Sequence, residues 1–170
     1  MIKLTSLILA MGLTVVSANE MNFEKKYSLN TEFGSPVDVS VVTTDLDNDG
    51  KLDMLWGSPA GVLRAEMENG RFESRGLVYK FENNKNPNMR VGVDVGDFNQ
   101  DGLKDIAYAT PDGVRILENQ GKNKFKDLGY IIKNHNMFVS ADVHVADVNN
   151  DGKDDIIYAT SPETQIWLNK

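Results

Sequence analysis

Apolar and polar residues alternate along this chain in three places, each directly before a run of acidic and amide side chains. Counted back from each run, the second, fourth, sixth and eighth residues are apolar or Thr: Thr43, Val41, Val39 and Val37; Val95, Val93, Val91 and Met89; Val145, Val143, Ala141 and Val139. Alternation with a period of two is typical of a β-strand with one buried face. The pattern therefore predicts three strands, each with an apolar face.

Each acidic run is followed by further short strand signals, written MLWG, IAYA and IIYA at their start. The first repeat predicts strands over Asp53–Gly57, Val62–Met67 and Phe72–Val78, with a hairpin turn at Asn69-Gly70. The second repeat predicts strands over Asp105–Ala109, Val114–Asn119 and Phe125–Ile132. The third predicts Asp155–Ala159 and Thr164–Asn169, after which the sequence ends one strand short of the same plan.

The acidic runs themselves read DLDNDGKLD, DFNQDGLKD and DVNNDGKDD. Oxygen-bearing side chains stand at positions one, three, five and nine of each: Asp45, Asp47, Asp49 and Asp53; Asp97, Asn99, Asp101 and Asp105; Asp147, Asn149, Asp151 and Asp155. A glycine at position six permits a sharp turn. Alternating oxygen ligands around such a turn suit Ca²⁺, so we expect three calcium ions, bound tightest at the all-Asp first loop.

The residues after the loops exclude an EF-hand. An EF-hand loop ends with a bidentate Glu at position twelve and lies between two helices. Position twelve here is Trp56, Tyr108 or Tyr158, and strand signals follow. Each loop therefore joins two β-strands.

The loops begin at residues 45, 97 and 147, a period of about fifty that is typical of propellers and related arrays. The predicted fold is all-β, with propeller-type blades: three four-stranded antiparallel repeats, each with a calcium loop between its first two strands. The repeats span about 37–88, 89–138 and 139–170.

The N-terminal residues predict two further features. Residues 1–18 combine Lys3, an apolar run and a small-residue cleavage site, as in a signal peptide, so we expect a secreted or periplasmic protein. The remaining domain is 19–170, in which residues 19–36 complete the last blade, because Asn22-Phe23 resembles Arg71-Phe72 and Lys124-Phe125. The alternative is that 19–36 form a frayed arm.

Charge and cysteine content narrow the partners. The net charge is −7, the chain has no cysteine, and no stretch beyond the signal is apolar and long enough to span a membrane. Three bound Ca²⁺ would offset most of the negative charge. A nucleic-acid partner is not expected, because that function needs a basic stripe.

The loops with their preceding VDVSVVTT, and the later segments ILENQGKNKF and IWLN, resemble the FG-GAP/VCBS repeat family, whose blades are those of integrin α-subunit propellers. Phe33-Gly34 stands where the family's Phe-Gly pair lies in the first repeat. The other repeats lack that pair, so the VCBS form fits better. The resemblance implies metal ligation by side chains at positions one, three, five and nine. It adds the position-seven backbone carbonyls of Lys51, Leu103 and Lys153.

Two sets of residues are candidates for more than calcium binding. Trp56, Tyr108 and Tyr158 share one repeat position and could stack on sugar rings, although packing between blades is the favoured interpretation. Asp94 and His144 stand three residues before the second and third loops and could form an acid/base or ligand pair. A structural role is the favoured alternative for His144.

The sequence contains no recognisable catalytic motif, and we do not expect an enzyme. Members of the family are mostly extracellular adhesion or carbohydrate-binding modules, sometimes attached to lyases or lipases. We therefore expect a binding or adhesion module for a glycan or protein partner. The alternatives are a calcium-dependent enzyme, of polysaccharide lyase or hydrolase type, and a structural subunit that completes a larger propeller.

Three blades are fewer than the four to eight that close a propeller. Two copies would supply six, so we expect a homodimeric six-bladed ring. The alternatives are a strained closure of three blades and completion by another chain.

Overall fold

The computed structural model describes residues 40–81, 90–133, 140–161 and 163–170. The signal peptide, the strand at Asn22-Phe23 and the pair Phe33-Gly34, all predicted from the sequence, lie outside these residues. All regular secondary structure in the described ranges is β-strand. Within the same ranges, no helix is long and apolar enough to cross a membrane.

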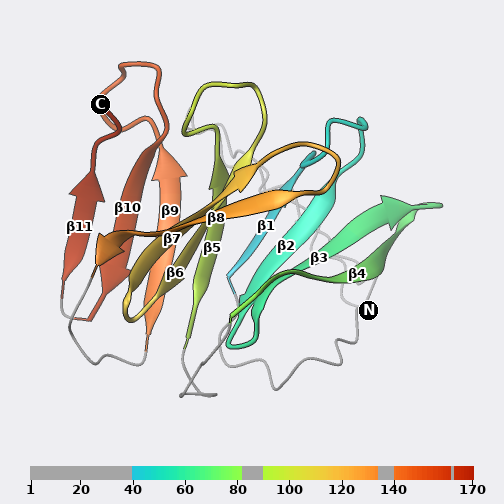
Figure 1. The fold of residues 1–170 in the computed structure, drawn as a ribbon, viewed down its shortest axis with the longest axis horizontal. Helices are drawn as coiled ribbons and strands as arrows, with labels where there is room; N and C mark the ends of the chain where they lie inside the picture. Colours follow the sequence, from blue (N-terminus) through green and yellow to red (C-terminus); the bar gives the residue numbers. More distant parts are fainter. Residues whose placement is uncertain (1–39, 82–89, 134–139, 162) are drawn as a thin grey trace, which may run out of the picture.

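The strands form three antiparallel sheets that follow one another along the chain (Figure 1). The first sheet contains β1 (Val41–Thr44), β2 (Asp53–Ser58), β3 (Gly61–Glu68) and β4 (Arg71–Lys80). The second contains β5 (Gly92–Gly96), β6 (Asp105–Thr110), β7 (Gly113–Asn119) and β8 (Phe125–Lys133). The third contains β9 (Ala141–Ala146), β10 (Asp155–Thr160) and β11 (Thr164–Trp167). Each sheet is a meander in chain order, which confirms the all-β class with propeller-type blades.

The turn chemistry explains the hairpins. Asn69 and Gly70, between β3 and β4, both have positive φ, at 49° and 79°. Two consecutive left-handed residues make the type I′ turn that suits the right-handed twist of paired strands. The hairpin expected at Asn69-Gly70 is therefore confirmed.

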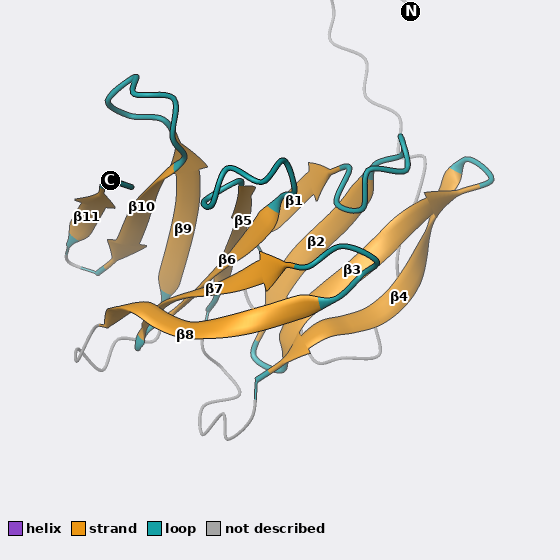
Figure 2. Cartoon of the chain, turned by 45° about the horizontal axis from the view of Figure 1, so that its top comes forward, coloured by secondary structure: helices purple, strands orange, loops and turns teal. Residues whose placement is uncertain are grey.

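The first strand of each sheet lies beside the first strand of the next, so that β1, β5 and β9 form an inner row (Figures 1 and 2). The Ser40 hydroxyl donates to the carbonyl oxygen of Val93 over 3.1 Å. The Ala141 N–H donates to the carbonyl oxygen of Arg90 over 3.2 Å. Because the sheets are arranged around this row, the three acidic loops lie along the same edge, at the top of Figure 2.

Strands β5 and β9 of the inner row approach each other closely because β5 has a glycine, Gly92, where it meets β9. A Cβ placed on Gly92 would lie 2.6 Å from both the Cα of Asp142 and the backbone nitrogen of Val143. Real Cβ contacts of that length do not occur, and backbone atoms have little freedom to move aside. Gly92 is therefore a requirement of the spacing between the second and third sheets.

Two apolar cores lie between the sheets. Leu55 and Val62 of the first sheet pack with Val93 and Tyr108 of the second. The second core joins the second and third sheets and includes Val143. Side chains from neighbouring sheets thus bury each other, as in stacked repeats.

Val37, Val39, Met89 and Val139 lie outside the described residues; at the described positions, the buried face predicted for the inner strands is confirmed in the second and third repeats and is wrong in the first. Val93 and Val143 are 2% and 5% exposed, whereas their equivalent Val41 is 54% exposed. Its neighbour Val42 is the residue that packs against the first core. Alternation of apolar and polar residues distinguishes the two faces of a strand, but it does not show which face a neighbouring sheet will cover. In β1 the covered face is that of Val42, and Val41 lies on the other face.

Candidate metal sites

The three acidic loops, Asp45–Asp53, Asp97–Asp105 and Asp147–Asp155, are called the first, second and third loops, with positions numbered one to nine. Four side chain–backbone hydrogen bonds recur in each. The position-one Asp accepts from the N–H groups of positions five and six, at 2.9–3.1 Å. The position-five Asp accepts from position seven, and the position-nine Asp from position two. The acidic side chains therefore shape the loops themselves.

The backbone conformation also repeats. Position four has a left-handed φ of 59°, 58° and 59° at Asn48, Gln100 and Asn150. The position-six glycines have φ between 82° and 85°. Such values favour glycine and asparagine because they carry little steric penalty there. The three loops therefore have the same local backbone structure.

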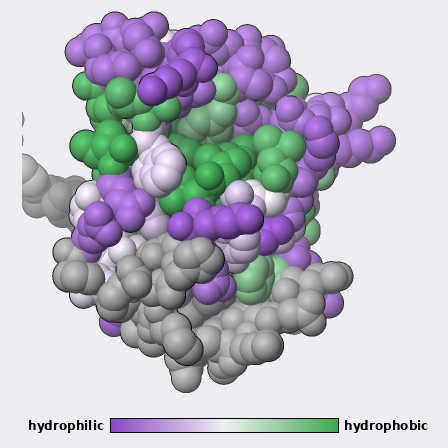
Figure 3. All heavy atoms as spheres, turned by 60° about the vertical axis from the view of Figure 1, so that its left-hand side comes forward, coloured by the Kyte–Doolittle hydropathy of each residue, from purple (hydrophilic) through white to green (hydrophobic). Residues whose placement is uncertain are grey.

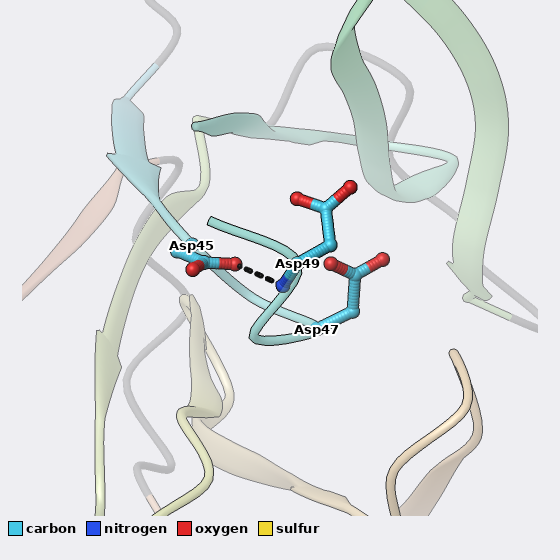
Figure 4. Close-up of side chains that lie close together, drawn as sticks. All are labelled: Asp45, Asp47 and Asp49. Carbon is cyan, nitrogen blue, oxygen red and sulfur yellow. Dashed lines mark hydrogen bonds between the residues drawn. The ribbon is translucent and has the colours of Figure 1, made fainter. Parts of the chain in front are cut away.

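The first loop brings three carboxylates together. One oxygen from each of Asp45, Asp47 and Asp49 can be chosen so that all lie within 4.8 Å of one another. Figure 4 shows the carboxylates of Asp47 and Asp49 beside each other, while Asp45 hydrogen-bonds the backbone nitrogen of Asp49 over 3.0 Å. Asp47 Oδ1 is buried and has no hydrogen-bond partner among the described residues. A buried carboxylate oxygen without a partner is costly unless a cation meets it.

The second and third loops have an amide at position three. In both, the Asn side chain spans the position-five Asp: Asn99 Oδ1 accepts from the Asp101 N–H over 3.1 Å, and its Nδ2 donates to Asp101 Oδ2 over 2.9 Å. Asn149 and Asp151 repeat the arrangement. An amide oxygen keeps a second lone pair, so this arrangement still offers an oxygen ligand.

The position-nine carboxylates are buried supports of the loops. Asp53, Asp105 and Asp155 are 3%, 1% and 0% exposed. The second oxygen of Asp105 accepts from the Asn119 N–H and that of Asp155 from the Asn169 N–H, both over 2.8 Å. Burial raises the pKa of Asp53 and of Asp105. Asp53 is not one of the three carboxylates gathered in the first loop.

The position-seven residues, predicted to supply carbonyl ligands, donate their N–H groups to position five. These residues are Lys51, Leu103 and Lys153, and their distances are 2.8–3.0 Å. The Lys51 ammonium also lies 2.7 Å from Asp49 Oδ2. Hydrogen bonding by Lys51 lowers the pKa of Asp49, so this exposed carboxylate keeps its charge.

An arginine that sequence reasoning missed reaches the first loop. Arg64, on β3, is 2% exposed, and its Nη2 lies 2.7 Å from Asp47 Oδ2 and 3.0 Å from Asp53 Oδ1. It stands between Leu63 and Ala65, where a charged residue would be taken for an outward-facing position. The available signal was an unmatched charge: position three is Asp in the first loop and Asn in the other two, and the first repeat has an arginine where the others have isoleucine.

Neighbouring loops are joined to each other. Asp154, at position eight of the third loop, accepts a hydrogen bond from the N–H of Asp97 over 2.7 Å. Gln100 Nε2 donates to the carbonyl oxygen of Gly152 over 3.2 Å. The second and third loops are therefore mechanically connected.

The aromatic set at position twelve packs between sheets in two of three cases. The hydroxyl of Tyr108 donates to the Ser58 carbonyl oxygen over 2.9 Å, and that of Tyr158 to the Thr110 carbonyl oxygen over 2.8 Å. Each tyrosine is thus buried against the preceding sheet, as expected. Trp56 differs, because it belongs to a cluster of its own sheet that includes Leu63 and Ala65.

Asp94 and His144 come together, as their shared repeat position suggested. His144 Nδ1 lies 3.0 Å from Asp94 Oδ2 across the β5–β9 junction. The same oxygen accepts from the Val145 N–H over 2.8 Å, and the imidazole is 70% exposed. The contact joins two sheets, which is a structural role for Asp94.

An apolar groove lies between the outer strands of the second and third sheets. Among the described residues, the edge strand β11 of the third sheet pairs with β10 alone, and this sheet has three strands where the other two have four. A cavity of about 320 Å³ lies between β8 and β11, with apolar walls formed by Ile116, Ile132, Ile156, Leu128, Ile131 and Trp167. Leu128, Ile131 and Trp167 are 45–47% exposed. Figure 3 shows apolar surface gathered on this side of the molecule, under the hydrophilic loops.

Comparison with known families agrees with the repeats. The sequence pattern of the FG-GAP-like repeat matches residues 45–108 and 97–158. Each match begins at the start of one loop and ends in the strand that follows the next loop, which is β6 or β10. The chain belongs to the FG-GAP-like repeat family. A search of curated proteins gives no match.

Proposed function

We propose that the chain is a calcium-binding protein that holds one Ca²⁺ in each loop. The observation that carries this proposal is the partnerless buried oxygen of Asp47 among three gathered carboxylates. The donor set is entirely oxygen, as calcium prefers. The proposed ligands are Asp45, Asp47, Asp49, Lys51 and Asp53; Asp97, Asn99, Asp101, Leu103 and Asp105; Asp147, Asn149, Asp151, Lys153 and Asp155.

The hydrogen bonds of the loops suit this role. Each oxygen of the position-one Asp takes one backbone N–H, which fixes its direction and leaves a lone pair for a cation. The position-nine Asp connects position two of its loop to a residue further along its repeat. That residue is Arg64 in the first repeat, Asn119 in the second and Asn169 in the third. These contacts preorganise the loop, so less ordering remains to be done when a metal binds.

Thermal melts in calcium and in EGTA test the proposal. Each filled site contributes about 2.7 kcal/mol at a hundredfold excess over its Kd, so the melting temperature should rise with calcium. Native mass spectrometry should count three ions. A triple variant, Asp45→Asn, Asp97→Asn and Asp147→Asn, is the matched control and should not respond. An unchanged wild-type melting temperature would contradict the proposal.

We further propose that the protein is a secreted or periplasmic binding module that recognises a glycan or a protein and does not catalyse a reaction. Membership of the FG-GAP-like repeat family supports a binding module of propeller type. Residues 1–18 support export. Cell fractionation and N-terminal sequencing test the second point, with a mature chain beginning near Asn19 as the expected result.

Two kinds of assay distinguish the binding role from the enzymatic alternative. Glycan arrays and capture of partners from the native envelope should give calcium-dependent binding. A panel of polysaccharide substrates should give no turnover. Turnover that disappears in His144→Ala would establish the enzymatic alternative instead.

We also propose a homodimer, in which a second copy covers the groove between β8 and β11. The support is the exposed apolar wall and the edge of β11 that no other described strand covers, since soluble proteins usually cover such edges. The predicted strand Phe23–Leu29 of the second copy is the proposed occupant, because Asn22-Phe23 and the residues after it resemble the starts of β4 and β8.

Light scattering of the chain from residue 19 onward should give a dimer mass, and deletion of residues 19–30 should return a monomer. Because the chain has no cysteine, Ser28→Cys and Gln165→Cys on differently tagged copies can report the contact. A disulfide between copies is the expected product. A disulfide that forms within one double-variant chain would contradict the exchange.

A further inference from the structure

Arg64 occupies a repeat position at which the other two repeats are apolar. It lies nineteen residues after the first Asp of its loop, where the second and third repeats carry Ile116 and Ile166. Ile116 is 4% exposed and belongs to the core between the second and third sheets. A buried arginine at this position therefore needs local compensation that the other repeats do not provide.

The first loop provides that compensation. Arg64 Nη2 lies 2.7 Å from Asp47 Oδ2, 3.0 Å from Asp53 Oδ1 and 3.0 Å from Glu66 Oε1. Its Nη1 donates to Asn123 Oδ1, in the β7–β8 turn of the second sheet. Arginine stays protonated in proteins, and here the guanidinium is paired with the carboxylates of Asp47 and Asp53. The guanidinium is a permanent cation inside the first repeat.

The extra cation matches an extra anion. Position three is Asp47 in the first loop and Asn99 or Asn149 in the others. The carboxylate of Asp47, which the other two loops lack at position three, is one of those that Arg64 contacts. Charge at the first loop is therefore balanced in part by the protein itself.

We propose that Arg64 is the built-in cation of the first loop, which keeps this loop folded without metal and makes it the weakest calcium site of the three. This inference rests on the calcium-binding function proposed for the loops. It reverses the order expected from composition, in which Asp at all four side-chain ligand positions makes the first loop the tightest site.

Two effects of the guanidinium produce this order. Asp47 Oδ2 is committed to Arg64, so one oxygen of that carboxylate remains for a metal. A divalent ion among Asp45, Asp47 and Asp49 would also lie near a buried positive charge, and repulsion between like charges is screened weakly away from water. We expect the affinity of the first loop to be lower by roughly tenfold or more, equivalent to a coupling of about 1.4 kcal/mol or more.

A site-resolved calcium titration tests the inference. Each loop contains one glycine, Gly50, Gly102 or Gly152, whose N–H donates to the position-one Asp. The NMR resonances of these amides report the three loops separately. In the wild-type protein, Gly102 and Gly152 should reach saturation at lower calcium than Gly50.

The variant Arg64→Ile gives the first repeat the residue that the other repeats carry. Its Gly50 resonance should saturate at roughly tenfold lower calcium. In the absence of metal, the loop amides of this variant should exchange with solvent faster than in the wild type. Arg75→Gln is the matched control, since Arg75 also pairs with Glu66 but is more exposed, and the order of the three sites should not change.

A second pair of variants decides the matter if Arg64→Ile does not fold. Asn99→Asp gives the second loop four carboxylates without a guanidinium, so Gly102 should saturate at lower calcium. Asp47→Asn removes a carboxylate that Arg64 already neutralises, so Gly50 should shift much less. Equal and opposite shifts in the two variants would overturn the inference.

The outcomes for Arg64 and for the function are distinguishable. If none of the three glycine resonances responds to calcium, the calcium-binding function itself is wrong. If all respond, but Gly50 saturates with or before the others and Arg64→Ile does not change that order, only the role of Arg64 is wrong.

Discussion

The side-chain amide of Asn119 donates a hydrogen bond to the carbonyl oxygen of Leu46, 73 residues earlier, over 2.9 Å. Asn119 ends β7 in the second sheet, and Leu46 is position two of the first loop. Asn169 makes the same contact to the carbonyl oxygen of Phe98 in the second loop, also over 2.9 Å. Each of these loops is therefore held by the sheet that follows it.

Replacing Asn119 by leucine should lower the free energy of unfolding. The variant keeps the side-chain volume but leaves the carbonyls of Leu46 and Lys104 without this donor, at a cost of about 1–3 kcal/mol for each. Asn169→Leu should cost less, because Asn169 is less buried. Urea unfolding of both variants measures the difference. Equal losses would show that the burial of the amide does not set the cost.

Asp154 should carry coupling between the second and third loops. Asp154→Ala removes the acceptor of the Asp97 N–H, so the second loop should lose roughly two- to tenfold in calcium affinity although the change lies in the third. The Gly102 resonance measures this effect. Leu52→Ala, the equivalent change in the first loop, should leave Gly102 unaffected.

The ion pair of Arg115 and Asp127 should make the junction of the first two sheets sensitive to acid. Arg115 Nη2 lies 2.6 Å from Asp127 Oδ2, which also accepts from the Tyr79 hydroxyl over 3.0 Å. Partial burial would raise the pKa of Asp127, but hydrogen bonds from Arg115 and its other donors outweigh it and lower the pKa. A lowered folded pKa gives stability that is present above the ordinary value of 3.8 and lost as the pH falls through the folded value.

Asp127→Asn tests this contribution. At neutral pH the variant should be less stable than the wild type by about 1–2 kcal/mol. The difference between the two proteins should shrink as the pH falls below about 4. Asp112→Asn, at an exposed turn away from Arg115, removes a carboxylate without touching this ion pair and is the control. A difference that stays constant with pH would assign the loss to packing.

Gly92→Ala should be strongly destabilising, by about 1–3 kcal/mol or more, because its Cβ would meet the backbone of β9. Gly57→Ala is a graded comparison. There the nearest atom is the side-chain Cγ2 of Val91, at 2.9 Å, which has more freedom to move. Thermal melts of the two variants should therefore differ in this order. The reverse order would place the tighter packing at the first junction.

Local patterns predicted the strands because they depend on neighbouring residues. The first and last residues of β2, β3 and β6 differ by at most one residue from those of the strands predicted from the sequence. The hairpin at Asn69-Gly70 follows from two residues that accept positive φ. Such features need no knowledge of the rest of the chain.

Tertiary relationships could not be derived from the same patterns. Val41 and Val93 have the same place in the repeat, yet a sheet covers one and the other is exposed. Arg64 is buried because Asp47 and Asp53, 17 and 11 residues away, fold against it. The position-nine Asp was expected as a ligand, but its role in holding Asn119 and Asn169 depends on where the third strand ends.

The close contact at Gly92 has a consequence for how this chain could be lengthened. The residues at the same repeat position are Ser40, Gly92 and Asp142, and the glycine leaves the space that the backbone of Asp142 fills. Duplication of the second repeat would set Gly92 opposite the backbone of another Gly92, which it would still accept. A copy of the first or third repeat in the second place would instead put the side chain of Ser40 or Asp142 where Gly92 has none. The repeats are therefore not interchangeable at this junction, and a gene fusion that adds blades would have to fit the residue at this position to its new neighbour.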